Sequence, residues 1–589
     1  MSVQMTEVAA GHAERAFASW LHDHATAMES GSAGAVLETL DKNCWWRDLL
    51  ALTWNLGTSH GHGPIAELLN QHLATARPAS FAIDTGFGPV DAIDDNGTIT
   101  GFFLFETPSA WCRGVATLAE VDGAWRAISM MTGMEDLKGH ERAIGTRRPV
   151  GPRHLPGARS SHNWKDQRAE KVAYRDRDPE TVVIGAGQGG LAVAANLGLM
   201  GVDTLVIERS ERVGDGWRKR YHSLVLHDPV WADHLPYLPF PSSWPIYSAK
   251  DKIADWFEFY AEAMELNVWT QADMYESSYD AAAGRWTLKI RTPEGERVIH
   301  PQDVILATGA AAEVNLPEFP HREAFGGVSY HSSGHSSGGD WAGRKAVVIG
   351  ACNSAHDIAQ DLYESGAAVT MVQRSSTYIM SQEFGIPALF GANFVEGGPP
   401  TEYADLMASG TPWPRVLELA VEGTKATAAL DADLLASLDA VGFKRNDGPG
   451  GTGLMGYALA RGGGYYIDVG CSRLIAERKI HLVQGSGLAE FTESGVRLED
   501  GRELEADLVV LATGYKNMRE TARRVLGDEV ADACPDVLGI GADGEIGGLY
   551  RPTGAPGFWF MGGPLAWVRI YSKHLALQIV ARQKGVIPR

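Results

Sequence analysis

The sequence predicts an α/β protein in which two dinucleotide-binding units of the doubly wound type follow a smaller α+β domain. Two stretches have the order of a buried strand, a tight turn and a helix: TVVIGAGQGGLAVAANL from residue 181 and AVVIGACNSAHDIAQDL at 346–362. From residue 181 onward strand-like and helix-like segments alternate, which is typical of a parallel sheet covered by helices. The 589 residues are too many for one core and leave room for about three domains of roughly 150 residues each.

The balance of charge and hydropathy argues against nucleic acid or a membrane as partner. The formal net charge is -21, which repels polyanions. No apolar run is long enough to cross a bilayer, and MSVQMTEVAAGHAERAF lacks the basic and then apolar order of a secretory signal. We therefore expect a cytoplasmic protein. Its five cysteines are widely spaced and form no CxxC pair, so we expect no metal site and no redox dithiol.

Residues 1–145 are predicted to form a separate α+β domain. Apolar residues recur at helical spacing in AERAFASWLHDHATAM and in GPIAELLNQHLATA, where Pro64 falls near the first turn. Strand-like runs follow, with an Asp-Gly turn between the last two: SFAIDTGFG, GTITGFFLFET, AWCRGVATLAEV and AWRAISMMTGM. Helices followed by a curled antiparallel sheet resemble the NTF2-like or SnoaL-like cone, with WWRDLLALTWNLGTSHGHGPI as its passage from helix to helix.

In some enzymes with that fold, an Asp and a His in the pocket of the cone perform acid–base chemistry. The resemblance makes candidates of Asp48, His60, His62 and His72. The alternative is a cone used for docking or for covering an active site, and we favour it because a fold does not imply a function. Residues 146–180 are rich in Pro, Arg and Gly with little periodicity, which predicts a linker that wraps the surface.

The first turn has the spacing G-x-G-x-x-G of a dinucleotide site, formed by Gly185, Gly187 and Gly190 with Gln188 and Gly189 between them. The first glycine permits the tight turn, the second lets a pyrophosphate approach the backbone, and the third lets helix and strand pack closely. The helix N-terminus offers free N–H groups to the phosphate. The next strand, TLVIE, ends at the usual distance for an acid that accepts hydrogen bonds from ribose hydroxyls, here Glu208, followed by Arg209.

The second turn places Gly350, Cys352 and Ala355 at the three motif positions. Between them, Asn353 and Ser354 offer further hydrogen bonds to phosphate. Cys352 is either a small residue that the turn tolerates or a reactive thiol whose pKa the helix dipole lowers. We favour the first interpretation because no second cysteine lies nearby in the sequence.

The strand after the second turn, AAVTMVQRSS, ends at Arg374 and Ser375. An arginine rather than an acid at this place suits a ribose 2′-phosphate and predicts NADPH rather than NADH. The guanidinium presents a planar fork to phosphate oxygens. The alternative is an ordinary surface arginine.

Three further features resemble FAD proteins with two dinucleotide domains. GDGWRKRYHSLVLHDP, with Gly216 and Trp217, follows the first acid, and the strands DVILATGA (303–310) and DLVVLATGY (507–515) each end in Ala-Thr-Gly. In such proteins these strands mark where the chain passes between the domains, which adds the candidates Thr308, Gly309, Thr513 and Gly514. The resemblance implies two interleaved Rossmann-like domains, with FAD at 181–330 and 475–589 and NADPH at 331–474.

Residues 175–589 resemble the flavin-containing monooxygenases, a group of class B flavoprotein monooxygenases, and among them the YUCCA-like branch. The fingerprint F-x-G-x-x-x-H appears as Phe325, Gly327 and His331, and the run Y-x-x-L-x-L-H-x-P contains His227. The resemblance implies FAD and NADPH, a C4a-hydroperoxyflavin formed with O2, and transfer of one oxygen atom to a small organic substrate. That substrate is an N- or S-nucleophile or a 2-oxo acid, and a homodimer is one option for the assembly. The implied catalytic residues are His227, Asn353 and His331.

Other activities stay open. Baeyer–Villiger monooxygenases share the fingerprint, but they have an Arg just before the strand that matches YYID, where this chain has Gly464 with Arg461 nearby. They also have a Trp where this chain has His335. A flavin reductase or NADPH oxidase without oxygen insertion would share both turns without needing the fingerprint around His331. A non-catalytic binding protein is disfavoured because the turn glycines and Glu208 are present.

Overall fold

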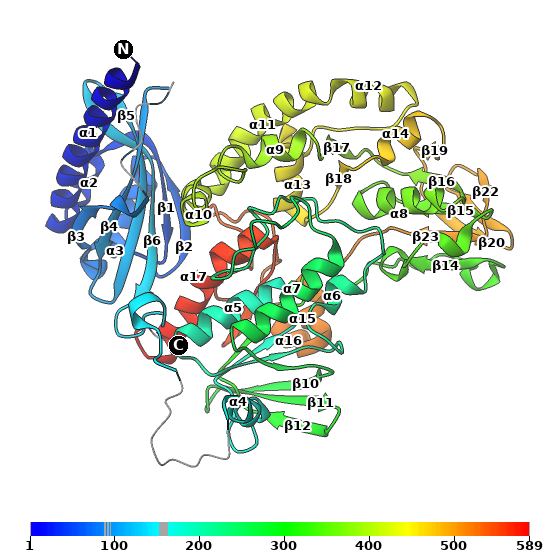
Figure 1. Cartoon of the computed structure of the whole chain (residues 1–589), viewed down its shortest axis with the longest axis horizontal. Helices are drawn as coiled ribbons and strands as arrows, with labels where there is room; N and C mark the ends of the chain where they lie inside the picture. The colour runs from blue at the N-terminus through cyan, green and yellow to red at the C-terminus, as the bar shows by residue number, and fades with distance from the viewer. Residues whose placement is uncertain (1, 88–89, 91–93, 95, 152–162, 588–589) are drawn as a thin grey trace.

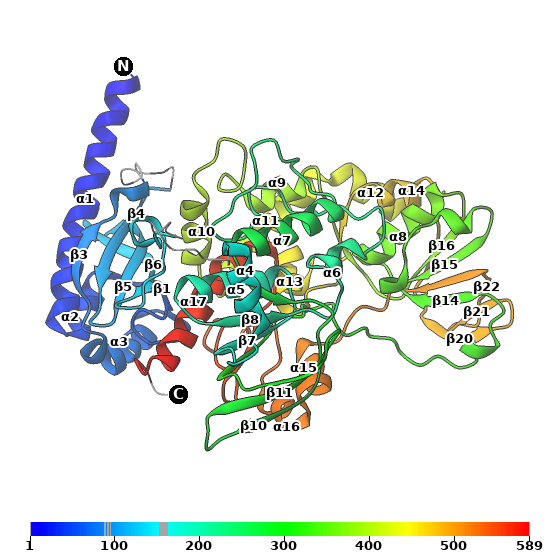
Figure 2. The ribbon, with the colours of Figure 1, turned by 60° about the horizontal axis from the view of Figure 1, so that its bottom comes forward.

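The chain forms an N-terminal domain and two α/β units in a row. The computed structural model describes residues 2–87, 90, 94, 96–151 and 163–587. The N-terminal domain lies at one end of the molecule and the second α/β unit at the other (Figures 1 and 2). The predicted mixed α/β fold with two parallel, helix-covered sheets is confirmed.

The N-terminal domain is a six-stranded sheet with helices packed on it. The strand order is β2-β1-β6-β5-β4-β3, and β1 runs parallel to β6 while the other neighbours are antiparallel. Helix α1 lies along the sheet (Figure 1) because Phe17, Trp20 and Met28 recur on one side of it and are buried. The elements are α1 (Ser2–Ser30), α2 (Ala33–Glu38), β1 (Leu40–Leu49), β2 (Leu56–His60), α3 (His62–Ala76), β3 (Ala79–Ile83), β4 (Thr98–Glu106), β5 (Ala110–Val121) and β6 (Ala124–Leu137).

The predicted helices of this domain are present, and strands lie in all four predicted strand segments. Asp122 and Gly123 make the expected turn, with φ values of 52° and 77°. The predicted passage from helix to helix at residues 45–65 was wrong, because this segment contains the second half of β1 and all of β2. The predicted antiparallel sheet also contains one parallel pair, β1 with β6. Because residues 46–49 are buried in succession, β1 lacks the alternation of polar and apolar residues that predicts a strand. Residue 88, the end of one predicted strand, lies outside the described residues.

The predicted linker contains a helix, α4 (Trp164–Ala173), which the weak periodicity of the segment did not indicate. Asn163 caps it, since its side chain accepts the N–H of Asp166 while the Asp166 carboxylate accepts the N–H of Asn163. Arg168 donates to Asn267 at 2.9 Å and so fixes the helix to the edge of the first parallel sheet. Residues 152–162 of the linker lie outside the described residues.

The first parallel sheet has the strand order β24-β13-β7-β8-β9. Helices α5 and α17 pack against each other beside it (Figure 1). A three-stranded antiparallel sheet, β10-β11-β12, is attached below. The elements are β7 (Thr181–Ile184), α5 (Gln188–Leu199), β8 (Thr204–Ile207), α6 (Asp215–Arg218), α7 (Lys250–Ala263), β9 (Asn267–Trp269), β10 (Asp273–Asp280), β11 (Arg285–Thr292), β12 (Gly295–Ile299), β13 (Asp303–Leu306), α15 (Met518–Leu526), α16 (Asp528–Ala533), β24 (Phe558–Phe560) and α17 (Leu565–Gln583).

The second parallel sheet, with the order β14-β23-β15-β16-β19, lies in the chain between β13 and β24 of the first. The predicted boundary at residue 475 was therefore wrong, because residues 481–511 still supply β19 and β23 to this sheet. The start is at residue 328 rather than 331, because β14 pairs with β23. The elements are β14 (Val328–His331), β15 (Lys345–Ile349), α8 (Asn353–Glu364), β16 (Ala368–Gln373), α14 (Cys471–Ala476), β19 (His481–Gln484), β20 (Leu488–Thr492), β21 (Gly495–Leu498), β22 (Glu503–Glu505) and β23 (Leu508–Leu511).

A helical segment between two short paired strands joins the second unit to the N-terminal domain. Helix α10 reaches the N-terminal sheet and α12 lies near α14 of the second unit (Figure 1). Its elements are β17 (Tyr378–Ser381), α9 (Gly385–Phe390), α10 (Thr401–Gly410), α11 (Trp413–Leu430), α12 (Ala432–Ala440), α13 (Gly453–Arg461) and β18 (Tyr465–Asp468).

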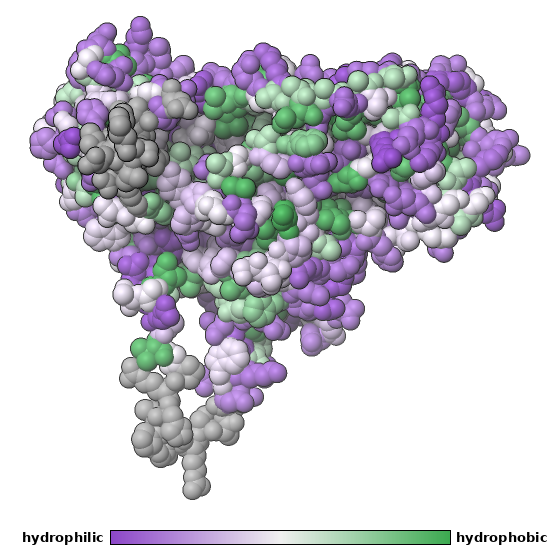
Figure 3. Space-filling view, turned by 45° about the horizontal axis from the view of Figure 1, so that its top comes forward, coloured by the Kyte–Doolittle hydropathy of each residue, from purple (hydrophilic) through white to green (hydrophobic). Residues whose placement is uncertain are grey.

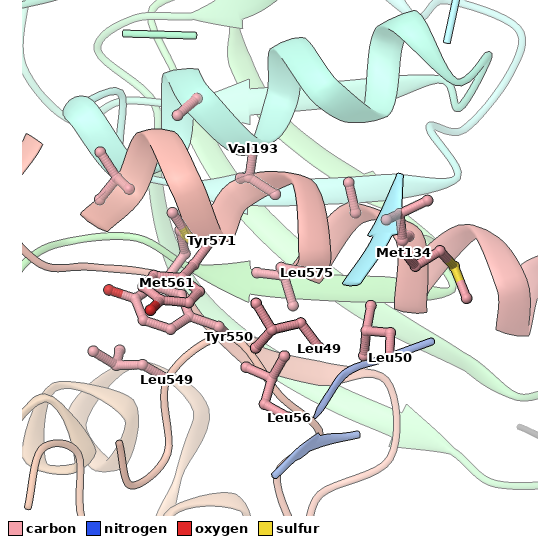
Figure 4. Close-up of a cluster of buried hydrophobic side chains, with 14 of the residues drawn as sticks. Leu49, Leu50, Leu56, Met134, Val193, Leu549, Tyr550, Met561, Tyr571 and Leu575 are labelled. Carbon is pink, nitrogen blue, oxygen red and sulfur yellow. The ribbon is translucent and has the colours of Figure 1, made fainter. Parts of the chain in front are cut away.

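The N-terminal domain and the first α/β unit share one hydrophobic core. Leu49 and Leu56 of the N-terminal domain lie beside Tyr571 and Leu575 of α17, and Val193 of α5 lies in the same cluster (Figure 4). On the surface drawn in Figure 3, apolar residues form separate patches among hydrophilic ones. Among the described residues, none of the helices combines the length and apolar character that crossing a bilayer requires.

Candidate functional site

The first glycine turn has the geometry of a dinucleotide site. Gly185 has a φ of +108°, and a Cβ there would lie 2.8 Å from the carbonyl oxygen of Ala307 on the neighbouring strand. A Cβ on Gly190 would lie 1.9 Å from the carbonyl oxygen of Gly185, so only glycine lets α5 pack on β7. A Cβ on Gly187 would meet no described atom within 4 Å, which leaves room for a pyrophosphate at the N-terminus of α5.

Glu208 lies directly after β8 and faces this turn. Its carboxylate accepts the N–H of Ala186 at 2.9 Å and that of Ser210 at 2.8 Å. Carboxylate oxygens have further lone pairs, which suit ribose hydroxyls. Arg209 beside it is exposed.

Gln188 connects the turn to two distant segments. Its side chain donates to the carbonyl oxygen of Gly563 at 3.3 Å and accepts the indole N–H of Trp217 at 3.3 Å. Gly216 beside Trp217 is exposed, and Gly189 packs against Met561. The sequence analysis did not predict that Gly563 contributes to the turn. The pattern that could have indicated it is the pair of glycines between β24 and α17.

Two predicted residues have unpartnered polar atoms, and one of them, Thr308, lies beside the first turn. Thr308 Oγ1 and His227 Nδ1 are buried, and neither has a hydrogen-bond partner among the described residues. Gly309 has a φ of +80° and open space around it. Burial lowers the pKa of His227 to about 4, so the ring is neutral at pH 7. Thr308 Oγ1 and the open space at the turn fit a dinucleotide whose polar groups complete the missing hydrogen bond.

Two acids follow His227 and were not predicted. Burial raises the pKa of Asp228 to about 6, and burial together with the charge of Asp228 raises the pKa of Asp233 well above its ordinary value. Neither oxygen of Asp233 has a hydrogen-bond partner among the described residues. Arg569 supports this segment by donating to the carbonyl oxygens of Ala232 and His234. The signal in the sequence is a pair of acids inside HDPVWADH, between apolar residues.

The second turn repeats the backbone of the first. Gly350 has a φ of +132°, and Cys352 caps α8 with a φ of -113°, close to the -84° of Gly187. A negative φ accommodates a side chain, which explains why cysteine is tolerated there. Ala355 is buried against the sheet. Burial raises the pKa of the Cys352 thiol, which favours the predicted tolerated residue over a reactive thiolate.

Asn353 and Ser354 begin α8, and both are half-buried. Asn353 Oδ1 accepts the N–H of Ile467 at 2.9 Å and so holds β18 beside the second turn. Its amide nitrogen is still free to act as a donor toward phosphate. Contact with phosphate, and a catalytic role for Asn353, stay predictions.

Arg374 and Ser375 are exposed directly after β16. No carboxylate within the described part of the chain forms an ion pair with Arg374. Arg374 therefore lies exposed at the end of the strand beside the second turn, where a ribose phosphate would lie in a doubly wound fold, and its side chain borders that of Glu499.

His331 has a positioning role in the structure, and its catalytic role stays a prediction. Its Nδ1 accepts the N–H of Ser333 at 3.1 Å, so Nε2 carries the proton and donates to the carbonyl oxygen of Gly514 at 3.0 Å. Burial lowers the pKa of His331 and keeps it neutral. Nδ1 thus holds the turn directly after β14, and Nε2 fixes β14 to the turn after β23. Gly514 also accepts the N–H of Asn315, and Thr513 contacts Asn315 in return, so the two passages between the units are joined.

The candidate residues of the N-terminal domain do not form an acid–base site. Asp48 is buried and accepts hydrogen bonds from Thr53, Thr132 and the N–H of Leu52. Burial raises its pKa. No hydrogen bond within the described residues joins Asp48 to His60, His62 or His72. The ring of His60 instead stacks on that of Trp45, with the ring centroids 3.7 Å apart. This supports the favoured interpretation of a domain used for docking.

Comparisons with known proteins agree with this geometry. Residues 182–383 match the pyridine nucleotide-disulphide oxidoreductase family. The indole-3-pyruvate monooxygenase YUCCA1 of Oryza sativa subsp. japonica is 33% identical over 341 residues, which cover 58% of this chain and 77% of the relative. A probable indole-3-pyruvate monooxygenase, YUCCA3 of Arabidopsis thaliana, is 32% identical over 342 residues, covering 57% and 73%.

Solved structures share the fold of the two α/β units. Cyclohexanone monooxygenase with bound ε-caprolactone has a TM-score of 0.51 at 17% identity, covering 69% of this chain and 88% of that one. Its open form has a TM-score of 0.50 at 17% identity, covering 69% and 89%. At this identity the likeness speaks for the fold alone.

Proposed function

Because the chain belongs to the flavin-containing monooxygenase family and is a flavin-dependent monooxygenase, we propose that it uses NADPH and FAD to transfer one oxygen atom from O2 to a 2-oxo acid. The relatives named above act on indole-3-pyruvate, a 2-oxo acid, which supports this substrate class. In the balanced reaction, R–CO–COOH, O2, NADPH and H⁺ give R–COOH, CO2, H2O and NADP⁺. The bond between the carbonyl carbon and the carboxyl group breaks, and NADPH supplies the two electrons.

The first turn and its neighbours would hold FAD. Gly187 leaves the pyrophosphate its space, Glu208 accepts ribose hydroxyls, and Thr308 and His227 supply unpartnered polar atoms. FAD bound there supplies the oxygen-activating chemistry, and the protein supplies orientation and exclusion of water. Neutral His227 would offer its unpartnered Nδ1 as a hydrogen-bond acceptor or donor to the bound flavin. Asp228, with its pKa of about 6, is able to hold or release a proton near neutral pH.

The free guanidinium of Arg374 is the observation that carries the choice of NADPH. It stands exposed after β16 without an ion-pair partner among the described residues, where a 2′-phosphate would lie. Arg374→Gln should raise KM for NADPH at least tenfold and leave KM for NADH nearly unchanged. Arg415→Gln, at an exposed position in α11, is the control. Equal effects on both coenzymes would contradict the assignment.

Oxygen transfer is tested with isotopically labelled O2 and phenylpyruvate as the probe. We expect one labelled atom in phenylacetate and one CO2 released for each NADPH consumed. Complete recovery of the electrons as hydrogen peroxide, with every 2-oxo acid tried, would overturn the proposal in favour of an NADPH oxidase or flavin reductase.

Baeyer–Villiger oxidation of a ketone is a second candidate, favoured by Arg461. A Cβ built on Gly464 would lie 2.4 Å from Nη2 of Arg461, so the Arg461 guanidinium occupies the space of a side chain at position 464. An arginine is thus present beside β18 although the aligned residue is glycine. Conversion of phenylacetone to its ester would support this candidate. A homodimer and a cytoplasmic location stay predictions, which light scattering and cell fractionation would check.

A further inference from the structure

A cavity of about 410 Å³ lies between the N-terminal sheet and the first α/β unit. Its walls come from β5 and β6 on one side and from α10 and α17 on the other, which are neighbours in Figures 1 and 2. Met131, Gly133 and Glu135 alternate along β6 and therefore present one face of that strand to the cavity. The volume is in the range of roughly 300–1,000 Å³ that ligand sites occupy, and such sites occur preferentially between domains.

One carboxylate in this cavity is surrounded by three cations. Glu135 lies 2.7 Å from Lys573 Nζ, 3.5 Å from Arg142 Nη2 and 3.9 Å from Arg113 Nη1. Lys573 comes from α17 and the other three residues from the N-terminal domain or the segment that follows it, so only the docked chain forms the cluster.

Each of the four cations at the cavity wall has a carboxylate partner, but two of these partners lie behind the wall. Arg113 also pairs with Asp84 and Arg142 with Asp136, but neither of those acids lines the cavity. Arg569 is neutralised by Asp405 through two hydrogen bonds. In all, four cations and three carboxylates line the wall: Arg113, Arg142, Arg569 and Lys573, against Glu135, Glu402 and Asp405.

The pKa values of the buried groups reflect the cations that lie around Glu135. Burial alone would raise the pKa of Glu135, yet Lys573, Arg113 and Arg142 bring it down to about 2. Burial lowers the pKa of Lys573, and Arg142 and Arg113 lower it further against the pull of Glu135. Burial and the charge of Lys573 lower the pKa of His574 to about 3, so this histidine is neutral.

We propose that this cavity is a binding site for a small organic acid, whose carboxylate is held by Arg113, Arg142 and Lys573. Guanidinium groups bind carboxylates through paired hydrogen bonds, and both arginines here are oriented by acids behind them. The apolar part of the ligand lies against the aliphatic part of the wall, formed by Leu49, Met131, Ile144, Leu406 and Ile570.

This site is distinct from the flavin turn. Asn196, which lines the cavity, is eight residues along α5 from Gln188, and so about 12 Å from the turn at 1.5 Å per residue. Arg569 links the two places, because it lines the cavity and also donates to Ala232 and His234 in the segment that follows His227. The proposal does not depend on which substrate the flavin site oxidises.

The test is titration calorimetry on the FAD-loaded full chain, with phenylacetate as the probe and phenylacetamide as its uncharged counterpart. Lys573→Gln should weaken phenylacetate binding at least tenfold, and Glu135→Gln, which removes the competing carboxylate, should strengthen it severalfold. Phenylacetamide should bind weakly to all variants. Lys584→Gln, exposed just beyond the end of the same helix, is the matched control and should match the parent protein.

The opposite signs keep the proposal falsifiable, since a variant that merely disturbs the fold would weaken binding in both cases. Phenylacetate affinity that is unchanged in Lys573→Gln would overturn the proposal. So would affinity that falls only in His227→Ala, because the probe would then lie in the flavin site.

Discussion

Replacing Arg47 by Met should detach the N-terminal domain from the monooxygenase units at the cost of a large part of its stability. Arg47 is fully buried, and its guanidinium donates to both carboxylate oxygens of Glu545, at 2.8 and 2.6 Å, and to the carbonyl oxygen of Ser409 at 2.8 Å. It also lies over the rings of Trp413 and Tyr571, at 5.3 and 5.5 Å.

The magnitude follows from what remains after the substitution. Glu545, whose side chain is 2% exposed, would keep a single side-chain donor to its carboxylate among the described residues, the hydroxyl of Thr58. Breaking a buried ion pair by removing one partner costs about 3–5 kcal/mol, because the other charge stays buried without compensation. The double variant Arg47→Met, Glu545→Gln removes that charge, so we expect a coupling of about 1–3 kcal/mol between the two positions.

The assay is guanidinium unfolding of the FAD-loaded protein, followed by tryptophan fluorescence, for both single variants and the double variant. Lys42→Met, exposed on the same strand as Arg47, is the matched control and should change stability by about 0.5 kcal/mol or less. A loss below about 1 kcal/mol for Arg47→Met, or a double variant that is simply additive, would refute the reasoning.

Three further predictions concern the two turns. Gly190→Ala should abolish retention of FAD through gel filtration, because its Cβ would meet a carbonyl oxygen at 1.9 Å; retained flavin would contradict the packing argument. Cys352→Gly should change kcat less than twofold, whereas a tenfold loss would indicate a functional thiol. His356→Phe should make the folded protein less sensitive to acid. Burial lowers the pKa of His356 to about 4, so the unfolded chain binds a proton at higher pH than the folded one. The parent protein therefore loses stability as pH falls from 6.5 towards 4. The phenyl ring keeps the stack on Tyr466 but removes up to about 3 kcal/mol of this loss, measured by unfolding at pH 7 and pH 4.5.

The sequence predicts those features whose cause is local. The roles of Gly185, Gly187 and Gly190 follow from spacing within one turn, and the structure places each where its role requires. The same holds for Glu208 after its strand. Strand β1 could not be predicted, because burial on both faces removes the alternation of residues.

Features that depend on distant pairing were missed. The boundary at 475 was misplaced because only the pairing of β23 with β15 shows which sheet the second Ala-Thr-Gly strand belongs to. The positioning role of His331 was missed because nothing local shows that its second ring nitrogen donates to the carbonyl oxygen of Gly514, 183 residues away. Glu135 and Lys573 are 438 residues apart, so no spacing within the sequence predicts the cavity that both residues line.

The N-terminal domain is best understood as part of the flavin-binding structure. Its Arg47 holds Glu545, which lies five residues before Tyr550. The Tyr550 hydroxyl donates to the carbonyl oxygen of Gly562, and the next residue accepts from Gln188 in the first turn. A continuous set of contacts thus runs from the N-terminal sheet to the place where the pyrophosphate would lie. Removing the domain would expose α17 and release this segment, so we expect weaker FAD binding even if the α/β units still fold.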